Sequence, residues 1–458
     1  MGKYLKLFQN HTEYEAFLQT DDFIKPNVSH CIQQNDVHYN PWTWAEQYLT
    51  MVAREDGTIS FYYPSNLPTT RGKSISYSIN DGEWITTNNV EETGAVVNVT
   101  VSEGDNVRWK GDNVSMAYDS GYVYSVFASD CEVDLKGNIM SLLYGDDFKD
   151  NNTLDTQTQT CAFSNLFSSD YQGNGLKVVN AKNLILPADT LTKNCYQGMF
   201  SYCTSLTTAP ELPATNLADW CYQEMFTNCT SLVTAPKLPA TTLAHMCYSG
   251  MFEGTNVLPD CTNIDFTSQT VLASNGLNGL FGGTTVTYAD LERILPKDAN
   301  NKPCLPVTTL TSSCYRSMFY NCTSLTKTPE LPATTLDTYC YDNMFYGCTS
   351  LTTVPSVLPA MGLKQNCYSN MFSGCTSLTT APELPATTLV SNCYKSMFRG
   401  CSSLNYIKAM FTTTPTIAET QDWVVNVAST GTFVKNSAAR WNVTGNNGIP
   451  SGWTVVTE

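Results

Sequence analysis

The sequence predicts a multidomain protein of β and α/β type, in which a solenoid of short stacked repeats follows a small antiparallel β-sandwich. Two observations predict this fold class. A block of the form CYxxMFxxCTSLTxxPxLPATTL recurs through much of the 458-residue chain, and residues 51–136 alternate apolar and polar side chains between turn signals. Repetition at a short fixed period is typical of solenoids, and short alternating strands are typical of sandwiches.

The composition allows a large core and disfavours two classes of partner. Hydrophobic residues make up 42% of the chain and charged residues 14%, and the net charge is 25 − 41 = −16. Such acidity disfavours nucleic acid and anionic membranes as partners, because both attract clustered Lys and Arg. The sequence shows no apolar run of spanning length and no secretory signal, so we expect no membrane insertion and no export by that route.

Residues 1–50 are predicted to be a separate anchor segment. They contain the run KPNVSHCIQQNDVHYNP, which resembles an opening found in structural proteins of phages that infect gut Bacteroidales, including crAss-like phages. The resemblance implies that this segment binds a particle or neighbouring subunits.

Residues 51–136 are predicted to form the β-sandwich. The strand-like run 74–79 leads into Asn80-Asp81-Gly82, a hairpin turn signal, and Val97, Val99 and Val101 alternate with polar residues. The pattern favours an immunoglobulin-like type, although the Cys–Trp–Cys framework of true immunoglobulin domains is absent.

Residues 137–160 are predicted to be a linker. Asp146, Asp147 and Asp150 cluster there beside two asparagines. A calcium site is conceivable because that ion binds oxygen-rich loops, but the spacing is not that of an EF-hand, and a solvated acidic loop is favoured.

Residues 161–404 carry the repeat. The first Cys of each clear copy falls at steps of 26, 26, 67, 26, 27 and 26 residues, and two weaker copies begin near residues 161 and 276, which gives nine units. The clear copies begin at Cys195, Cys221, Cys247, Cys314, Cys340, Cys367 and Cys393.

Each unit is predicted to contain a short helix and a short extended segment. Cys195, Met199, Phe200 and Cys203 share one face at helical spacing. Residues 206–208 then extend until Pro210, which cannot donate to a sheet ladder and keeps the strand short. One unit cannot bury its apolar face alone, so neighbouring units must stack like side chains over like.

The block resembles the BspA-like leucine-rich repeats that are common in gut Bacteroidales and their phages. In that family an AFxxC-type helix alternates with an LTxIxIP-type strand, and MFxxC and LTTAPELP occupy the matching places here. The resemblance covers about residues 155–404 and implies a leucine-rich-repeat solenoid, but it does not specify a function.

Residues 405–458 are predicted to be a short β cap for the last repeat. This segment holds Trp423, Trp441 and Trp453, and a solenoid needs a terminal cap to cover its last core face. Its ending resembles the segment that often follows these repeats.

The residues predict no catalytic, cofactor-binding or metal site. The 18 cysteines lack the C-x₂₋₄-C pairs of zinc sites. Buried thiols are favoured, with disulfides between neighbouring coils as the alternative. Only His11, His30, His38 and His245 are available as histidines, and none belongs to a Cys-His or Ser-His-Asp motif.

Some repeat positions vary between copies and include exposed aromatic groups, as a recognition surface requires, although drift at exposed positions explains the same pattern equally well. The candidate ligand-contact residues are Tyr202, Trp220, His245, Tyr320, Tyr339, Tyr346 and Arg399.

We therefore expect a non-enzymatic structural or adhesion protein of a phage virion, such as a head-fibre, decoration or tail-fibre component. Residues 1–50 would bind other virion proteins, and the repeats would contact a host-surface glycan or protein. A homo-oligomer is expected. The alternatives are a bacterial cell-surface adhesin and an enzyme that acts on surface glycan.

Overall fold

The computed structural model describes residues 47–63, 74–87, 96–118, 123–169, 174–257, 275–305 and 307–458. The predicted anchor, residues 1–50, therefore lies almost wholly outside the described residues, as do His11, His30 and His38. Its last residues do not belong to a separate segment, because β1 (Leu49–Ala53) begins within it.

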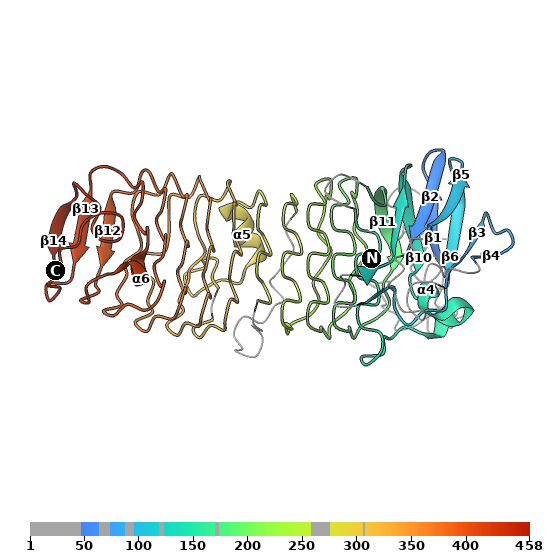
Figure 1. The fold of residues 1–458 in the computed structure, drawn as a ribbon, viewed down its shortest axis with the longest axis horizontal. Coiled ribbons are helices and arrows are strands. Elements are labelled where there is room, and N and C mark those ends of the chain that lie inside the picture. Colours follow the sequence, from blue (N-terminus) through green and yellow to red (C-terminus); the bar gives the residue numbers. More distant parts are fainter. Residues whose placement is uncertain are drawn as a thin grey trace, which may run out of the picture.

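A β-rich module occupies one end of an elongated molecule (Figure 1). A six-stranded sheet has the order β11-β10-β1-β6-β3-β4, and a three-stranded sheet has the order β5-β2-β9. The further strands of the first sheet are β3 (Ser76–Ile79), β4 (Ile85–Thr86), β6 (Asn106–Lys110), β10 (Val133–Asn138) and β11 (Val178–Ile185). The second sheet contains β2 (Gly57–Tyr62), β5 (Val96–Val101) and β9 (Val126–Ser129), and β7 (Ala117–Tyr118) pairs with β8 (Val123–Tyr124).

The two sheets share a buried core. Trp109 of β6 and Phe127 of β9 meet edge to face with ring centroids 4.9 Å apart, and both are fully buried. The alternation of apolar residues that predicts these strands therefore turns one face of each sheet inward. The first sheet is not purely antiparallel, because β11 pairs with β10 in parallel.

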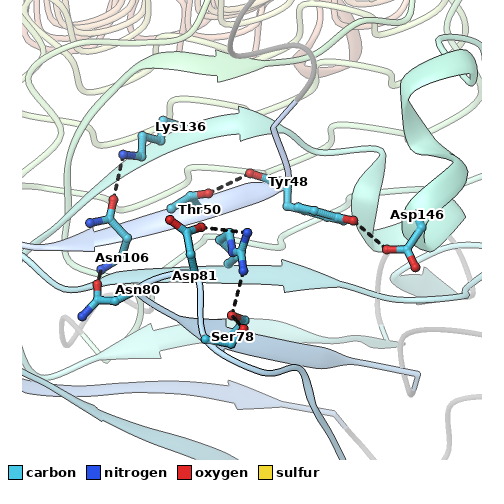
Figure 2. A network of polar contacts seen from close by, with 10 residues as sticks. Tyr48, Thr50, Ser78, Asn80, Asp81, Asn106, Lys136 and Asp146 are labelled. Carbon is cyan, nitrogen blue, oxygen red and sulfur yellow. Dashed lines mark hydrogen bonds and ion pairs between the residues drawn. The ribbon is translucent and has the colours of Figure 1, made fainter.

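The predicted linker contains the short helix α4 (Ser141–Tyr144) and the 3-10 helix η1 (Gly145–Asp150). Figure 2 shows how polar contacts fasten this segment to the first sheet: Tyr48 Oη donates to Asp146 Oδ1 at 2.6 Å. Lys110 Nζ lies 2.8 Å from the same carboxylate. The two hydrogen bonds to Asp146 lower its pKa, and burial is the first cause that raises the pKa of Tyr48 to about 12.

The repeats form a row of coils that continues directly from the module (Figure 1). Strand β11 pairs with β10 on one side, and on the other Asn180 forms a parallel bridge to Thr208, which bridges in turn to Thr234. These bridges are isolated rather than extended, as expected from the prolines that follow them.

Identical core side chains lie above one another in the coils. Phe319, Phe345 and Phe372 stack with centroid separations of 5.4 and 5.7 Å, and all three are fully buried. The repeat tyrosines form a parallel column, in which Tyr341 and Tyr368 lie 5.7 Å apart. The two degenerate copies join the same stack, since Phe167 contacts Phe200 and Phe281 contacts Phe319.

The predicted short helix over Cys195–Cys203 is wrong. This segment is a chain of tight turns, which we call a turn block. Alternate amides leave the coil: the N–H groups of Tyr196 and Phe200 donate to Cys221 and Met225 of the next coil, whereas that of Ser201 donates to Gly198 within the block. Every fourth residue, such as Gly198 (φ 59°), takes a left-handed conformation that no α-helix contains. An α-helix and a turn block both place apolar side chains four residues apart on one face, so the sequence pattern does not distinguish them.

The far end of the stack is closed by residues 405–458. Strands β12 (Tyr406–Ala409), β13 (Thr432–Lys435) and β14 (Thr454–Thr457) form a parallel sheet. Trp423 is fully buried against Phe398 of the last turn block. Two further helices are α5 (Tyr288–Ile294), in the insertion between coils, and α6 (Ile417–Thr420). No helix in the described ranges is long and apolar enough to cross a membrane.

Candidate functional site

A shallow groove crosses the turn blocks in the first half of the stack. It consists of two hollows of about 340 and 440 Å³ that share Glu224, Glu253 and Tyr320. Both volumes fall within the range of small-ligand sites, roughly 300–1,000 Å³. The other described lining residues are Ser201, Tyr202, Gln223, Thr227, Asn228, Met246, Ser249, Gly250, Gly254, Asn278, Gly279, Gly282, Gly283, Ser317 and Asn321.

The groove exists because one column of side chains is interrupted. We call the residue that follows each repeat Phe the outer column. In successive coils it reads Ser201, Thr227, Glu253, Gly282, Tyr320, Tyr346, Ser373 and Arg399. Backbone hydrogen bonds from Gly254 to Gly282 and from Gly283 to Tyr320 fix this order of coils. Gly282 therefore contributes no side chain between Glu253 and Tyr320, and the side chain of Glu253 leans over it, since a Cβ on Gly282 would lie 3.6 Å from Glu253 Cγ.

The floor of the groove is made of glycine residues, of which Gly250, Gly279 and Gly282 are buried and Gly283 is exposed. A Cβ atom built on Gly279 would lie 3.7 Å from Gly250 Cα, and one built on Gly283 would lie 3.6 Å from Gly254 Cα. Neighbouring coils therefore meet here glycine against glycine. The floor is therefore low, and it offers peptide groups to a ligand at Gly254 and Gly283, the two glycines that are not fully buried.

Aromatic rings and carboxylates form the rim. Tyr320 is half-buried and stacks on Tyr346 with ring centroids 5.1 Å apart and an interplanar angle of 8°. A Cβ on Gly250 would lie 3.3 Å from Glu224 Cγ and 3.4 Å from Glu253 Oε2, so the two acidic side chains converge on the floor.

The groove is lined by two carboxylate side chains and by no cationic side chain among the described lining residues. Partial burial raises the pKa of Glu224, and partial burial followed by the charge of Glu224 raises the pKa of Glu253. No Lys, Arg or His stands among the described lining residues. Glu224 accepts a long hydrogen bond of 3.4 Å from Gln223, which in turn accepts one from Gln197 of the preceding coil.

The structure brings together some of the predicted contact residues. Tyr202 and Tyr320 line the groove, and Tyr346 supports Tyr320 from behind. Trp220 lies in a neighbouring column and contacts His245 at 4.8 Å between ring centroids, while its Nε1 donates to Met246 Sδ, a groove residue, at 3.0 Å.

Two predicted residues lie in the second half of the stack, away from the groove. Tyr339 packs near the guanidinium of Arg316 at 5.7 Å, and Arg399 forms an ion pair with Asp422 at 3.6 Å. The sequence-based prediction also missed Glu224, Glu253 and the glycine floor. The run GLNGLFGG at residues 276–283 contains the signal, since Gly282 replaces the side chain that each clear copy carries at that place.

The described cysteines are buried thiols. Sixteen described cysteines are buried and take part in no described disulfide. The second Cys of a clear copy donates to the Phe carbonyl of the preceding coil, as Cys348 Sγ does to Phe319 O at 3.1 Å. Burial raises the pKa of Cys203 to about 12, so the reactive thiolate is scarce. In the described part of the chain, no group of three or more His, Cys, Asp or Glu residues is placed to hold a metal ion.

A larger hollow of about 820 Å³ lies on the outer face of β2, β5 and β9. Several of its polar groups already have partners within the protein. Asp130 Oδ1 accepts from the Thr58 amide, Lys177 Nζ donates to Asp130 O, and Ser60 Oγ donates to Asn98 Oδ1. The groove over the turn blocks is therefore the better candidate for ligand binding.

Comparison with known proteins identifies the repeat type. Residues 308–420 are similar to the BspA type leucine-rich repeat region, which is matched in six copies. No curated protein and no solved structure is detectably similar to the chain. The match covers the second half of the stack, and none of these comparisons points to a phage.

Proposed function

We propose that the chain is a non-enzymatic adhesion-type protein whose leucine-rich-repeat solenoid presents the groove between Tyr202 and Tyr320 to a surface polymer. The match of residues 308–420 to a BspA-type region supports a surface or adhesion role. The observation that carries the proposal is the polar hollow beside Tyr320, which lies where the outer column has Gly282 in place of a side chain.

Binding is favoured over catalysis by the character of the groove. It is open to solvent, and the pKa values of Glu224 and Glu253 are shifted in the same direction. A glycosidase pair divides the roles of acid and base by environments that push the two pKa values apart. A reducing-end assay on polysaccharide should therefore show no product, and steady hydrolysis would contradict the non-enzymatic role.

The more specific proposal places the protein on a phage particle, with residues 1–50 bound to other virion proteins and the chain in a homo-oligomer. Its support is the resemblance of the run within residues 25–41 to phage structural proteins. A bacterial cell-surface adhesin is the alternative location. Mass spectrometry of purified virions separates the two, since absence of the chain from the particle excludes the first.

The groove itself is tested by closing it. Gly282→Tyr inserts the side chain that the next coil carries in the same column, and the left-handed residues of the turn block are untouched. Because a Cβ on Gly282 would lie 3.3 Å from Gly279 O, we expect a small loss of stability in a thermal melt, with the variant still folded, and loss of attachment to intact bacteria in a sedimentation assay. Ser373→Tyr, the matched change in the second half, should attach like the wild type. Equal attachment by both variants would contradict the assignment of the groove.

A further inference from the structure

The side chains that line the groove indicate which class of ligand it can bind. Resting on the proposed binding function, we propose that the groove takes an uncharged sugar ring of a surface glycan, stacked on Tyr320 and hydrogen-bonded to Glu253 and Glu224.

The stacking position follows from the outer column. Tyr346 covers one face of Tyr320 at 5.1 Å, nearly parallel to it. On the other side the next coil contributes Gly282, so that face of Tyr320 borders the open hollow. The side chain of Glu253 leans over Gly282, with its Cγ 3.6 Å from where a Cβ would lie, so a ligand ring placed on this face of Tyr320 would meet Glu253 at its edge. Tyrosine offers a rigid, amphipathic face for such contact at low entropic cost.

The polar side chains of the groove can form hydrogen bonds with the hydroxyl groups of a sugar. Glu253 stands at the opposite side of Gly282 from Tyr320, and Glu224 converges on the same floor. Carboxylates accept strong hydrogen bonds from hydroxyl donors, and one carboxylate can accept from two neighbouring hydroxyls. The amide side chains of Asn228, Asn278 and Asn321 line the hollows as well, and they can both donate and accept. This mixture matches a polyhydroxylated ring better than an apolar one.

The charge of the groove excludes acidic sugars. Neither Glu224 nor Glu253 has an ionic partner among the described residues, and the described lining contains no cation. A uronate or sialate placed there would face two carboxylates at short range, where like charges disfavour binding. The groove should therefore select neutral glycans over acidic ones of the same length.

The experiment uses the full chain and two matched probe sets. Saturation-transfer NMR and calorimetry would measure binding of neutral oligosaccharides (gluco-, manno-, galacto- and N-acetylglucosamine oligomers) and of acidic ones (oligogalacturonate and sialylated lactose). We expect at least one neutral probe to bind and both acidic probes to fail. Tyr320→Ala and Glu253→Gln should each weaken binding about tenfold or more. Glu211→Gln changes an exposed residue outside the turn blocks and should leave the binding affinity unchanged.

The outcomes separate this inference from the proposed function. If no neutral probe binds while Gly282→Tyr still abolishes attachment to cells, the sugar assignment is overturned and the groove remains the attachment site. Preferential binding of deacetylated, cationic glucosamine oligomers over their neutral acetylated counterparts also overturns it, because the carboxylates would then recognise an ammonium group. If Gly282→Tyr attaches normally, the proposed function itself fails.

Discussion

The two halves of the repeat stack share their interior and differ at the turn-block surface. In residues 195–252 and in residues 314–401 the same Cys, Tyr, Met and Phe columns are buried. The outer column continues as Tyr320, Tyr346, Ser373 and Arg399 in the second half, whereas in the first half it breaks at Gly282 beside Glu253. Only the second half lies within residues 308–420, which match the BspA-type region. A constant core thus leaves surface positions free to build a local site, which we place where the repeat is least regular.

The largest effect should come from the shared core. Phe345→Ala and Phe226→Ala each remove a fully buried ring that stacks on neighbours above and below. Each should lower the free energy of unfolding by about 3–5 kcal/mol, measured by chemical denaturation. Similar losses at the two sites would support a common interior. A loss below about 1 kcal/mol at either site would show that its half is not packed in this way.

The next largest effect on stability is expected at a glycine that packs against an asparagine of the preceding coil. Gly347 has φ 72°, and a Cβ on it would lie 2.0 Å from Asn321 Oδ1; Gly374 has φ 77° without such a close contact, since its nearest neighbour is Gly347 Cα at 3.5 Å. Strain at a left-handed residue costs about 1–3 kcal/mol. Gly347→Ala should therefore destabilise more than Gly374→Ala in thermal melts. Equal melting temperatures would contradict the contact with Asn321.

A smaller effect is expected from the tyrosine column. The hydroxyl groups of Tyr222 and Tyr368 are buried and have no hydrogen-bond partner among the residues that the structure describes. An unsatisfied buried hydroxyl is unfavourable, so Tyr222→Phe and Tyr368→Phe should be neutral or stabilising by about 1 kcal/mol. A clear loss of stability in either variant would reveal a partner, such as bound water, for the hydroxyl group.

The smallest effect is the pH dependence of stability that is linked to Glu224 and Glu253 in the first half of the stack. The raised pKa values of Glu224 and Glu253 mean that protonation favours the folded state, so the stability linked to them is present at low pH and is lost as the pH rises through the folded values. Glu224→Gln should lower the pKa of Glu253 only in part, because burial is the larger cause. Carbon-13 NMR of the carboxyl groups measures this change, and an unchanged pKa would show that the two side chains do not interact.

The sequence predicts the stack better than it predicts the backbone of each unit. Repeated Cys, Met and Phe fix which side chains lie above one another, because only like-on-like stacking buries them all. The turn block escaped prediction because four-residue spacing also fits a helix. Asn228, Gly254 and Asn321 carried the missing signal, since Asn and Gly favour left-handed backbone conformations just before the second Cys position.

The candidate site was predicted only in part for a related reason. Tyr202 and Tyr320 could be chosen as exposed variable aromatics, but the groove depends on what is absent at Gly282 and on how Glu224 and Glu253 converge across coils. Convergence between coils depends on the order of stacking through the irregular insertion, where the spacing of the first Cys jumps to 67 residues. That order is a tertiary property, which the repeat spacing alone does not determine.

Hydrogen exchange on the full chain bound to purified surface polymer tests the central claim most directly. The account predicts added amide protection in the turn blocks of residues 198–283 and around Tyr320, with little change in residues 339–401. Protection concentrated in residues 339–401, or on the strand side of the coils, would contradict the assignment of binding to the groove.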